Sequence, residues 1–141
     1  FAVLLDAYLS GNNIPANAYQ GKANGDKVLP SVVCSADGDG EEDPRFSGIF
    51  HFNGEITIRT KAIAGPGTSD TDQLDASNAL VKAVEDFLSQ DDLAAQLSGA
   101  VDEFTAYPAG LFRYATSRDQ MDDVFEDKIP FRIYCCGAAL G

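Results

Sequence analysis

Five carboxylates fall within seven positions of the stretch CSADGDGEEDPRFSG, residues 34–48. They are Asp37, Asp39, Glu41, Glu42 and Asp43. Carboxylates at this density can ligate calcium, act as a catalytic acid and base, or hold a solvated loop open by mutual repulsion. Their spacing is the first test between these uses.

The spacing does not fit an EF-hand. That loop needs oxygen ligands at positions 1, 3 and 5, a glycine at position 6 and a bidentate glutamate at position 12. Counting from Asp37 places Glu42 at position 6 and Gly48 at position 12. Counting from Asp39 places Phe50 at position 12. We therefore favour a charged connection between two strands, with no metal and no other cofactor. An irregular calcium loop remains the alternative.

Patterns typical of enzymes are missing from the sequence. It has one histidine and no tryptophan, and it contains no GxSxG, HExxH or phosphate-binding P-loop motif. The histidine, His51, lies on the polar side of an alternating segment, so we expect it at the surface. Paired carboxylates could hydrolyse glycosides, but that chemistry usually also needs aromatic platforms, and the sequence has no tryptophan. The sequence predicts a protein that is not an enzyme and has no catalytic residue.

Composition limits the classes of partner. The 141 residues fit one domain, residues 1–141, and 45% of them are hydrophobic, which allows a real core. With 22 acidic and 10 basic residues the net charge is −12. Such a surface repels nucleic-acid phosphate and anionic membranes. No apolar run approaches the roughly 20 residues of a membrane span. The three cysteines lack zinc spacing, and we expect buried, reduced thiols.

Hydrophobic periodicity predicts an α+β fold. A helix is expected over residues 1–10, with Val3, Leu4, Ala7 and Tyr8 on its apolar face, and a loop over 14–27. Strands over 29–36 and 47–61 should form a large hairpin, with Gly54 marking a bulge or bend. A main helix is expected over 69–89, capped by Ser69 or Asp70.

The rest of the chain adds to the same sheet. The main helix should bury a stripe made of Leu74, Leu80, Val81, Val84, Phe87 and Leu88. A short helical turn over 91–99 follows it. Strands are expected over 101–106, 111–116 and 129–136, with an acidic loop over 117–127. This loop holds Asp119, Asp122, Asp123, Glu126 and Asp127. The expected fold is a mostly antiparallel sheet of about four to five strands, packed against a main helix pair.

The order of elements resembles a known family. "LPSVVCSADG", "GIFHFNGEITIRTKA", "DTDQLDASNALVKAVEDFL", "DLAAQLS" and "IPFRIYCC" follow one another after a short N-terminal helix. This order, with its spacing and size, is similar to that of the tail terminator and tail-completion proteins of tailed bacteriophages. The resemblance covers nearly the whole chain, and it rests on arrangement rather than on particular residues.

The resemblance implies a structural role in the virion. Such proteins form hexameric rings at the neck, cap the tail tube and dock the head connector, after assembly in the host cytoplasm. DNA passes through the ring, and an acidic lumen would repel its phosphates without binding it. Other head–tail connectors and minor capsid proteins share this fold and remain alternatives. Outside that class, the rival is a small cytosolic module whose acidic loops bind a divalent cation or a basic partner.

Charged residues are the candidate functional residues, whether the protein is a virion subunit or an acidic binding module. The ten acidic residues of the two predicted loops are candidates for the lumen or for docking on adjacent rings. Five arginines are candidates for ion pairs between subunits, namely Arg45, Arg59, Arg113, Arg118 and Arg132. An ordinary exposed charge is the alternative for each arginine, because surface ion pairs contribute little.

Overall fold

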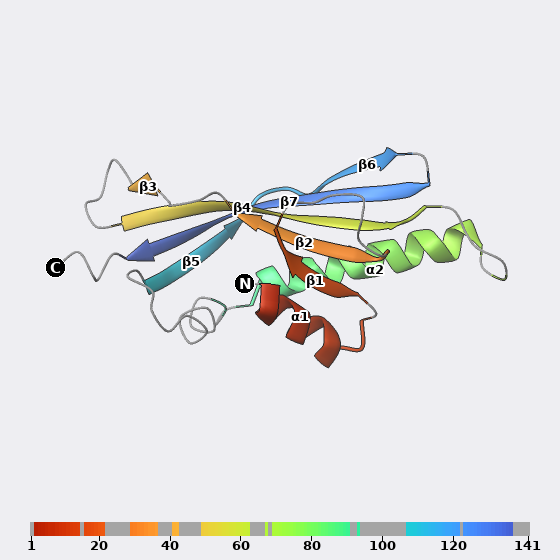
Figure 1. The fold of residues 1–141 in the computed structure, drawn as a ribbon, viewed down its shortest axis with the longest axis horizontal. Coiled ribbons are helices and arrows are strands. Elements are labelled where there is room, and N and C mark those ends of the chain that lie inside the picture. The colour runs from red at the N-terminus through yellow and green to blue at the C-terminus, as the bar shows by residue number, and fades with distance from the viewer. Residues whose placement is uncertain are drawn as a thin grey trace.

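Two long antiparallel strands, β4 (Ile49–Lys61) and β7 (Val124–Cys136), form the centre of the protein in this computed structural model (Figure 1). The structure describes residues 2–14, 16–21, 29–36, 41–42, 49–62, 67, 69–90, 93, 107–121 and 123–136. The other elements are α1 (Ala2–Gly11), β1 (Asn17–Gln20), β2 (Ser31–Ala36), β3 (Glu41–Glu42), α2 (Asp70–Leu88), β5 (Tyr107–Arg113) and β6 (Ser117–Met121).

The sheet has the path β1-β2-β4-β7-β5, with β3 paired to β4 and β6 paired to β7 off this path. The β1–β2 pair is parallel, and the other pairs are antiparallel. The predicted hairpin between residues 29–36 and 47–61 is confirmed as the β2–β4 pair. The predicted α+β class with a mostly antiparallel sheet is confirmed as well.

Helix α2 begins at a capping box. Ser69 accepts a hydrogen bond from the Asp72 amide at 3.1 Å, and the Asp72 carboxylate accepts one from the Ser69 amide. The buried stripe is the predicted one except for Leu74, which is 39% exposed. Leu74 lies in the second turn, before the first residue of the helix that is buried, Ser77. The predicted stripe therefore began one helical turn too early.

Helix α1 packs through a different face from the predicted one. Leu5 and Leu9 are fully buried, and Ala2 lies beside them in the core. Leu4 and Tyr8 only flank this face, and the Tyr8 ring lies 5.4 Å from that of Phe87 in α2. Both patterns have helical spacing, so periodicity alone could not choose between them.

The hydrophobic core fills the space between the two helices and one face of the sheet. Cross-strand neighbours share a face, so Ile56 and Ile58 of β4 face α2 together with Ile129 and Phe131 of β7. The β7 register runs past Gly54 without a shift, and the β2 register ends opposite it. Of the predicted bulge or bend, the bulge is therefore wrong. Gly54 instead lies against the Phe131 ring, where a Cβ atom would overlap ring atoms.

Several predicted boundaries were wrong. Residues 117–127 are not an acidic loop, because β6 and the start of β7 pair as a hairpin there. The region 14–27, expected to be a loop, contains β1. The strand predicted at 111–116 is β5, which runs earlier, and its register shifts between Pro108 and Gly110. The strand predicted at 101–106 lies outside the described residues, as does the 91–99 turn apart from Leu93.

Candidate interaction surfaces

An ion-pair network with a buried carboxylate lies where β6 and β7 meet α2. The Arg118 guanidinium donates to both carboxylate oxygens of Asp127, at 2.6 and 3.0 Å, and also to the Ser77 hydroxyl at 2.9 Å. The hydroxyls of Ser77 and Thr60 lie 2.6 Å apart, and Arg118 stacks 4.6 Å from the Phe125 ring centre. Asp127 is only 2% exposed. A paired, hydrogen-bonded carboxylate of this kind locks the hairpin to the helix.

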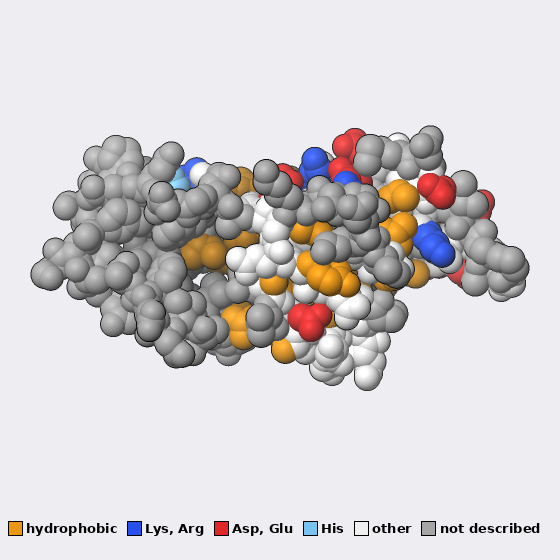
Figure 2. All heavy atoms as spheres, in the orientation of Figure 1, with side chains coloured by type: hydrophobic (Ala, Val, Ile, Leu, Met, Phe, Trp, Pro, Cys, Tyr) orange, Lys and Arg blue, Asp and Glu red, His pale blue; other side chains and the backbone are white. Residues whose placement is uncertain are grey.

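A second ion pair lies on the opposite side of β7 and joins it to β4. Arg59 and Glu126 are direct cross-strand neighbours, and two guanidinium nitrogens each lie 2.8 Å from one carboxylate oxygen. Lys128 approaches the other oxygen at 3.6 Å. Glu126 is buried. Figure 2 shows acidic and basic side chains beside one another over β6 and β7.

Most of the candidate arginines have a partner within the same chain. Arg113 lies 3.7 Å from the Glu85 carboxylate on α2, and Arg132 donates to the Asn53 side chain at 2.9 Å. Arg59 and Arg118 have the carboxylate partners described above. Pairing between subunits stays a prediction, but these intrachain contacts already engage the charges on which it depended. Arg45 lies outside the described residues.

The candidate acidic residues separate into different environments. Glu126 and Asp127 are buried strand residues, so their expected place in a solvated loop is wrong. Asp119 and Asp123 are exposed near the tip of the β6–β7 hairpin. Glu41 and Glu42 form β3, for which the backbone is described. Asp37, Asp39, Asp43 and Asp122 lie outside the described residues.

The exposed face of α2 is a larger acidic surface than the sequence reading suggested. Asp70, Asp72, Asp75 and Asp86 are all exposed. Lys82 pairs with Asp86 at 3.1 Å, which leaves the first turns of the helix strongly negative. The spacing of Asp72 and Asp75, three residues apart on one predicted helix, could have indicated this surface from the sequence.

An exposed aromatic pair lies at the end of β5. Phe112 is 62% exposed and Tyr114 is 43% exposed, and their ring centres are 6.1 Å apart. Phe112 is the cross-strand neighbour of Arg132, and Leu111 and Arg113 point to the other side, towards Ile133 and Glu85. Sequence reasoning missed this pair, although the alternation in residues 111–114 was visible.

A cavity of about 480 Å³ opens beside the first half of α2. Ala76, Ala79 and Leu80 of the helix form one wall. The opposite walls come from the segment after α1, the residue before β2 and the end of β4. The whole lining is Asn13, Ile14, Ala16, Pro30, Thr60, Gln73, Ala76, Ser77, Ala79 and Leu80. Its surface is mainly apolar, so it suits an apolar or aromatic group rather than an ion.

The reactive side chains of the described residues offer little chemistry. Burial raises the pKa of the Cys34 thiol to about 12, so the nucleophilic thiolate is scarce at neutral pH. His51 is half-buried rather than exposed as expected, and it meets Tyr134 edge-on at 6.3 Å. Among the described residues, no group of three His, Cys, Asp or Glu side chains is placed to hold a metal ion. No described helix has the length and apolarity to cross a membrane.

Comparison with known proteins gives a likeness of fold. No family model and no curated protein matches the sequence. The structure is similar to a chain in a solved structure described as the virion of a native gene transfer agent (GTA) particle. The TM-score is 0.58 and the sequence identity is 17%, over 95% of this chain and 85% of that chain. At this identity the likeness concerns the fold.

Proposed function

We propose that this protein is a non-enzymatic structural subunit of a virion. More specifically, we propose that it forms a ring at the neck of a tailed, phage-like particle. In this role it caps the tail tube, presents a docking surface to the head connector, and lets DNA pass through its lumen. Its working location is then the virion, after assembly in the cytoplasm of the host.

The observation that carries the proposal is the shared fold with a chain of a gene transfer agent virion, over 95% of this chain. The element order that resembles tail terminators supports the finer assignment independently, because it comes from the sequence. The two lines of support agree on a small α+β virion subunit.

Charge supports a channel role. At −12 per subunit, a ring concentrates negative potential around its axis, and passing DNA is repelled rather than trapped. The exposed Asp119 and Asp123 at the β6–β7 tip are the described candidates for the lumen. The same charge opposes assembly, because neighbouring subunits repel one another until salt screens them.

Mass photometry with and without calcium tests the ring. We expect particles of six times the 15.0 kDa subunit mass, unchanged by calcium. Their fraction should rise between about 0.1 M and about 1 M salt, since the screening length falls from roughly 10 Å to roughly 3 Å. A monomer that is stabilised by calcium would contradict the proposal and favour the acidic binding module. Assembly that weakens as salt rises would contradict the acidic lumen.

A further inference from the structure

Two surface features of the chain are complementary but cannot meet within one molecule. The first is the exposed aromatic pair, Phe112 in β5 and Tyr114 just after it. The second is the apolar cavity beside α2. Removing the apolar surface of an exposed ring from water is favourable, so binding of these rings in an apolar site is driven by their burial.

The cavity has the size and lining for an aromatic side chain. A cavity of roughly 150 Å³ holds a benzene molecule, and this one measures about 480 Å³. Ile14, Ala76 and Leu80 supply apolar walls, and the amides of Asn13 and Gln73 lie at its edge. Those amides can hydrogen-bond a phenol hydroxyl, which is the polar group that a buried tyrosine needs.

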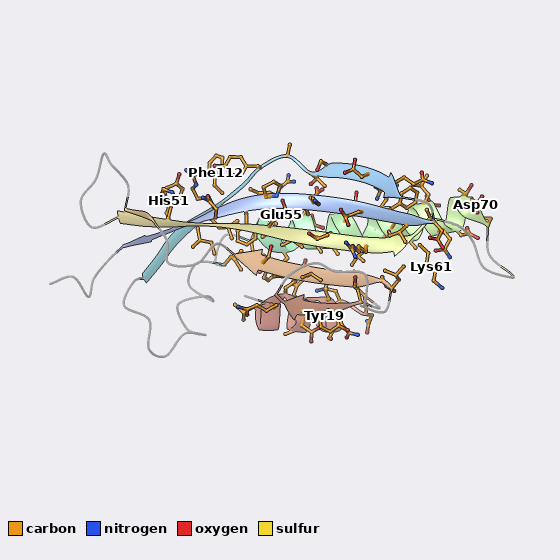
Figure 3. All side chains as sticks on the ribbon, turned by 45° about the horizontal axis from the view of Figure 1, so that its top comes forward. Tyr19, His51, Glu55, Lys61, Asp70 and Phe112 are labelled. Carbon is orange, nitrogen blue, oxygen red and sulfur yellow. The ribbon has the colours of Figure 1, made fainter. Side chains whose placement is uncertain are left out.

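Position excludes contact between the two features in the same chain. The side chain of Phe112 shares a face of the sheet with Arg132, away from α2, whereas the cavity lies on the α2 side. In Figure 3, Phe112 lies near His51 at one end of the long strands, and Asp70 at the start of α2 lies at the other end. The ring must therefore come from another molecule.

Charge favours a second copy of this chain as that molecule. Asp72 and Asp75 stand exposed on the helix that walls the cavity. Arg132 is the direct cross-strand neighbour of Phe112, and Lys128 lies four residues along the same strand face. Two carboxylates share this face. Glu55 lies on β4, one strand farther from Phe112, and the buried Glu126 lies between Lys128 and Arg59, with which it pairs. The aromatic pair is thus flanked by cations and the cavity by carboxylates, which sets the orientation of contact.

We propose that Phe112 and Tyr114 of one copy insert into the cavity beside α2 of a second copy. The contact joins two different surfaces, so each subunit keeps one aromatic pair and one cavity for its neighbours. Repetition closes a ring when the rotation closes, and gives a filament when it does not. The inference deepens the proposed function, because it names the interface on which a ring of this chain would depend.

Photo-crosslinking tests the contact itself. A benzophenone side chain is placed at position 112, and ¹⁵N-labelled and unlabelled copies are mixed before illumination. We expect mixed-isotope crosslinks from position 112 to the α2 segment 73–80. Crosslinks confined to one chain, crosslinks between copies to any other element, or no crosslinks would each overturn the proposal.

Variants test the head-to-tail arrangement by mass photometry. Phe112→Ala removes the more exposed ring of the aromatic pair and leaves the cavity unchanged. Ala76→Phe fills the cavity and leaves the aromatic pair unchanged. Each variant alone should stay monomeric, whereas an equal mixture should form dimers and nothing larger, because it retains one intact contact. Phe112→Leu, which keeps apolar volume, and Asn78→Phe, on the exposed side of the same helix, should assemble like the wild type.

The outcomes separate this inference from the proposed function. Wild-type assembly by Phe112→Ala or Ala76→Phe alone, or a full ring from their mixture, would overturn the contact and leave the ring proposal intact. Crosslinks to segment 73–80 in open chains without closed particles would support the contact and contradict the ring.

Discussion

The two faces of β7 are used differently, although they belong to one strand. On the side facing α2, Asp127, Ile129 and Phe131 are all buried, and the one charge among them is held by Arg118. On the other side, Lys128 remains partly exposed and Phe112 stands open beside Arg132. The helix side therefore carries most of the buried core. Apart from the buried Glu126, which pairs with Arg59, the open side over β5 and β7 presents side chains that can contact other molecules.

The largest expected effect is on the alkylation rate of Cys34, whose thiol is buried on the helix side of the sheet. With the pKa of Cys34 raised from 9.0 to about 12, its thiolate fraction near pH 8 should fall on the order of a thousandfold. Alkylation of Cys34, followed by mass spectrometry, should be slower in the folded protein by at least that factor than in urea. Because the folded state keeps this proton after the unfolded chain loses it, stability should also decline above pH 9.0. Equal alkylation rates in both states would contradict the burial.

Removal of the Asp127 carboxylate should be the most destabilising charge change. Asp127→Ala leaves the Arg118 guanidinium without its two-point partner beside α2, so we expect a loss of about 3 kcal/mol in unfolding free energy. Urea unfolding followed by circular dichroism measures it. Lys82→Ala, which breaks the exposed pair with Asp86, is the control and should unfold close to wild type. Equal effects of the two substitutions would contradict the burial of the Asp127 carboxylate.

Adding one methyl group at Gly54 should disturb the packing between β4 and β7 on the side that faces α2. Gly54→Ala places its Cβ atom into the Phe131 ring, and we expect a loss of about 2 kcal/mol because the packed ring must shift. Gly11→Ala, where the structure leaves open space, should cause no loss. Combining Gly54→Ala with Phe131→Leu should recover part of the stability. Full stability of Gly54→Ala would show that the ring does not pack there.

Loss of the α2 helix cap should lower the unfolding free energy less than the two substitutions above. Ser69→Ala removes the side-chain acceptor for the Asp72 amide, and we expect a loss of about 1 kcal/mol. Thermal unfolding against wild type measures the difference. Ser10→Ala, an exposed serine within α1, serves as the comparison and should have little effect. An unchanged melting temperature for Ser69→Ala would mean that the capping box is not formed in solution.

The parts of the fold that the sequence predicted are those set by local periodicity. The alternation in residues 47–61 and the apolar stripe in 69–88 each identify an element within one stretch of chain. The β6–β7 hairpin was missed because its acidic residues look solvated until register places Arg118 and Arg59 against them. Arg59 and Glu126 are 67 residues apart in the sequence, so no local pattern predicts that they pair.

The candidate surfaces were harder to predict for a related reason. Alternation indicates that Phe112 and Leu111 point to opposite sides, but it does not say which side α2 covers. That choice depends on the whole sheet, and it decides that Phe112 is exposed. The cavity beside α2 is likewise made by segments far apart in the chain, from Ile14 to Leu80.

The measurement that tests the division between the two faces most directly compares Phe112→Ala with Asp127→Ala in two assays. Urea unfolding gives the stability of each variant, and mass photometry gives its assembly. We expect Phe112→Ala to lose less than about 0.5 kcal/mol and to lose assembly, whereas Asp127→Ala loses about 3 kcal/mol and still assembles while folded. A Phe112→Ala protein that assembles normally, or that is destabilised as much as Asp127→Ala, would contradict the account.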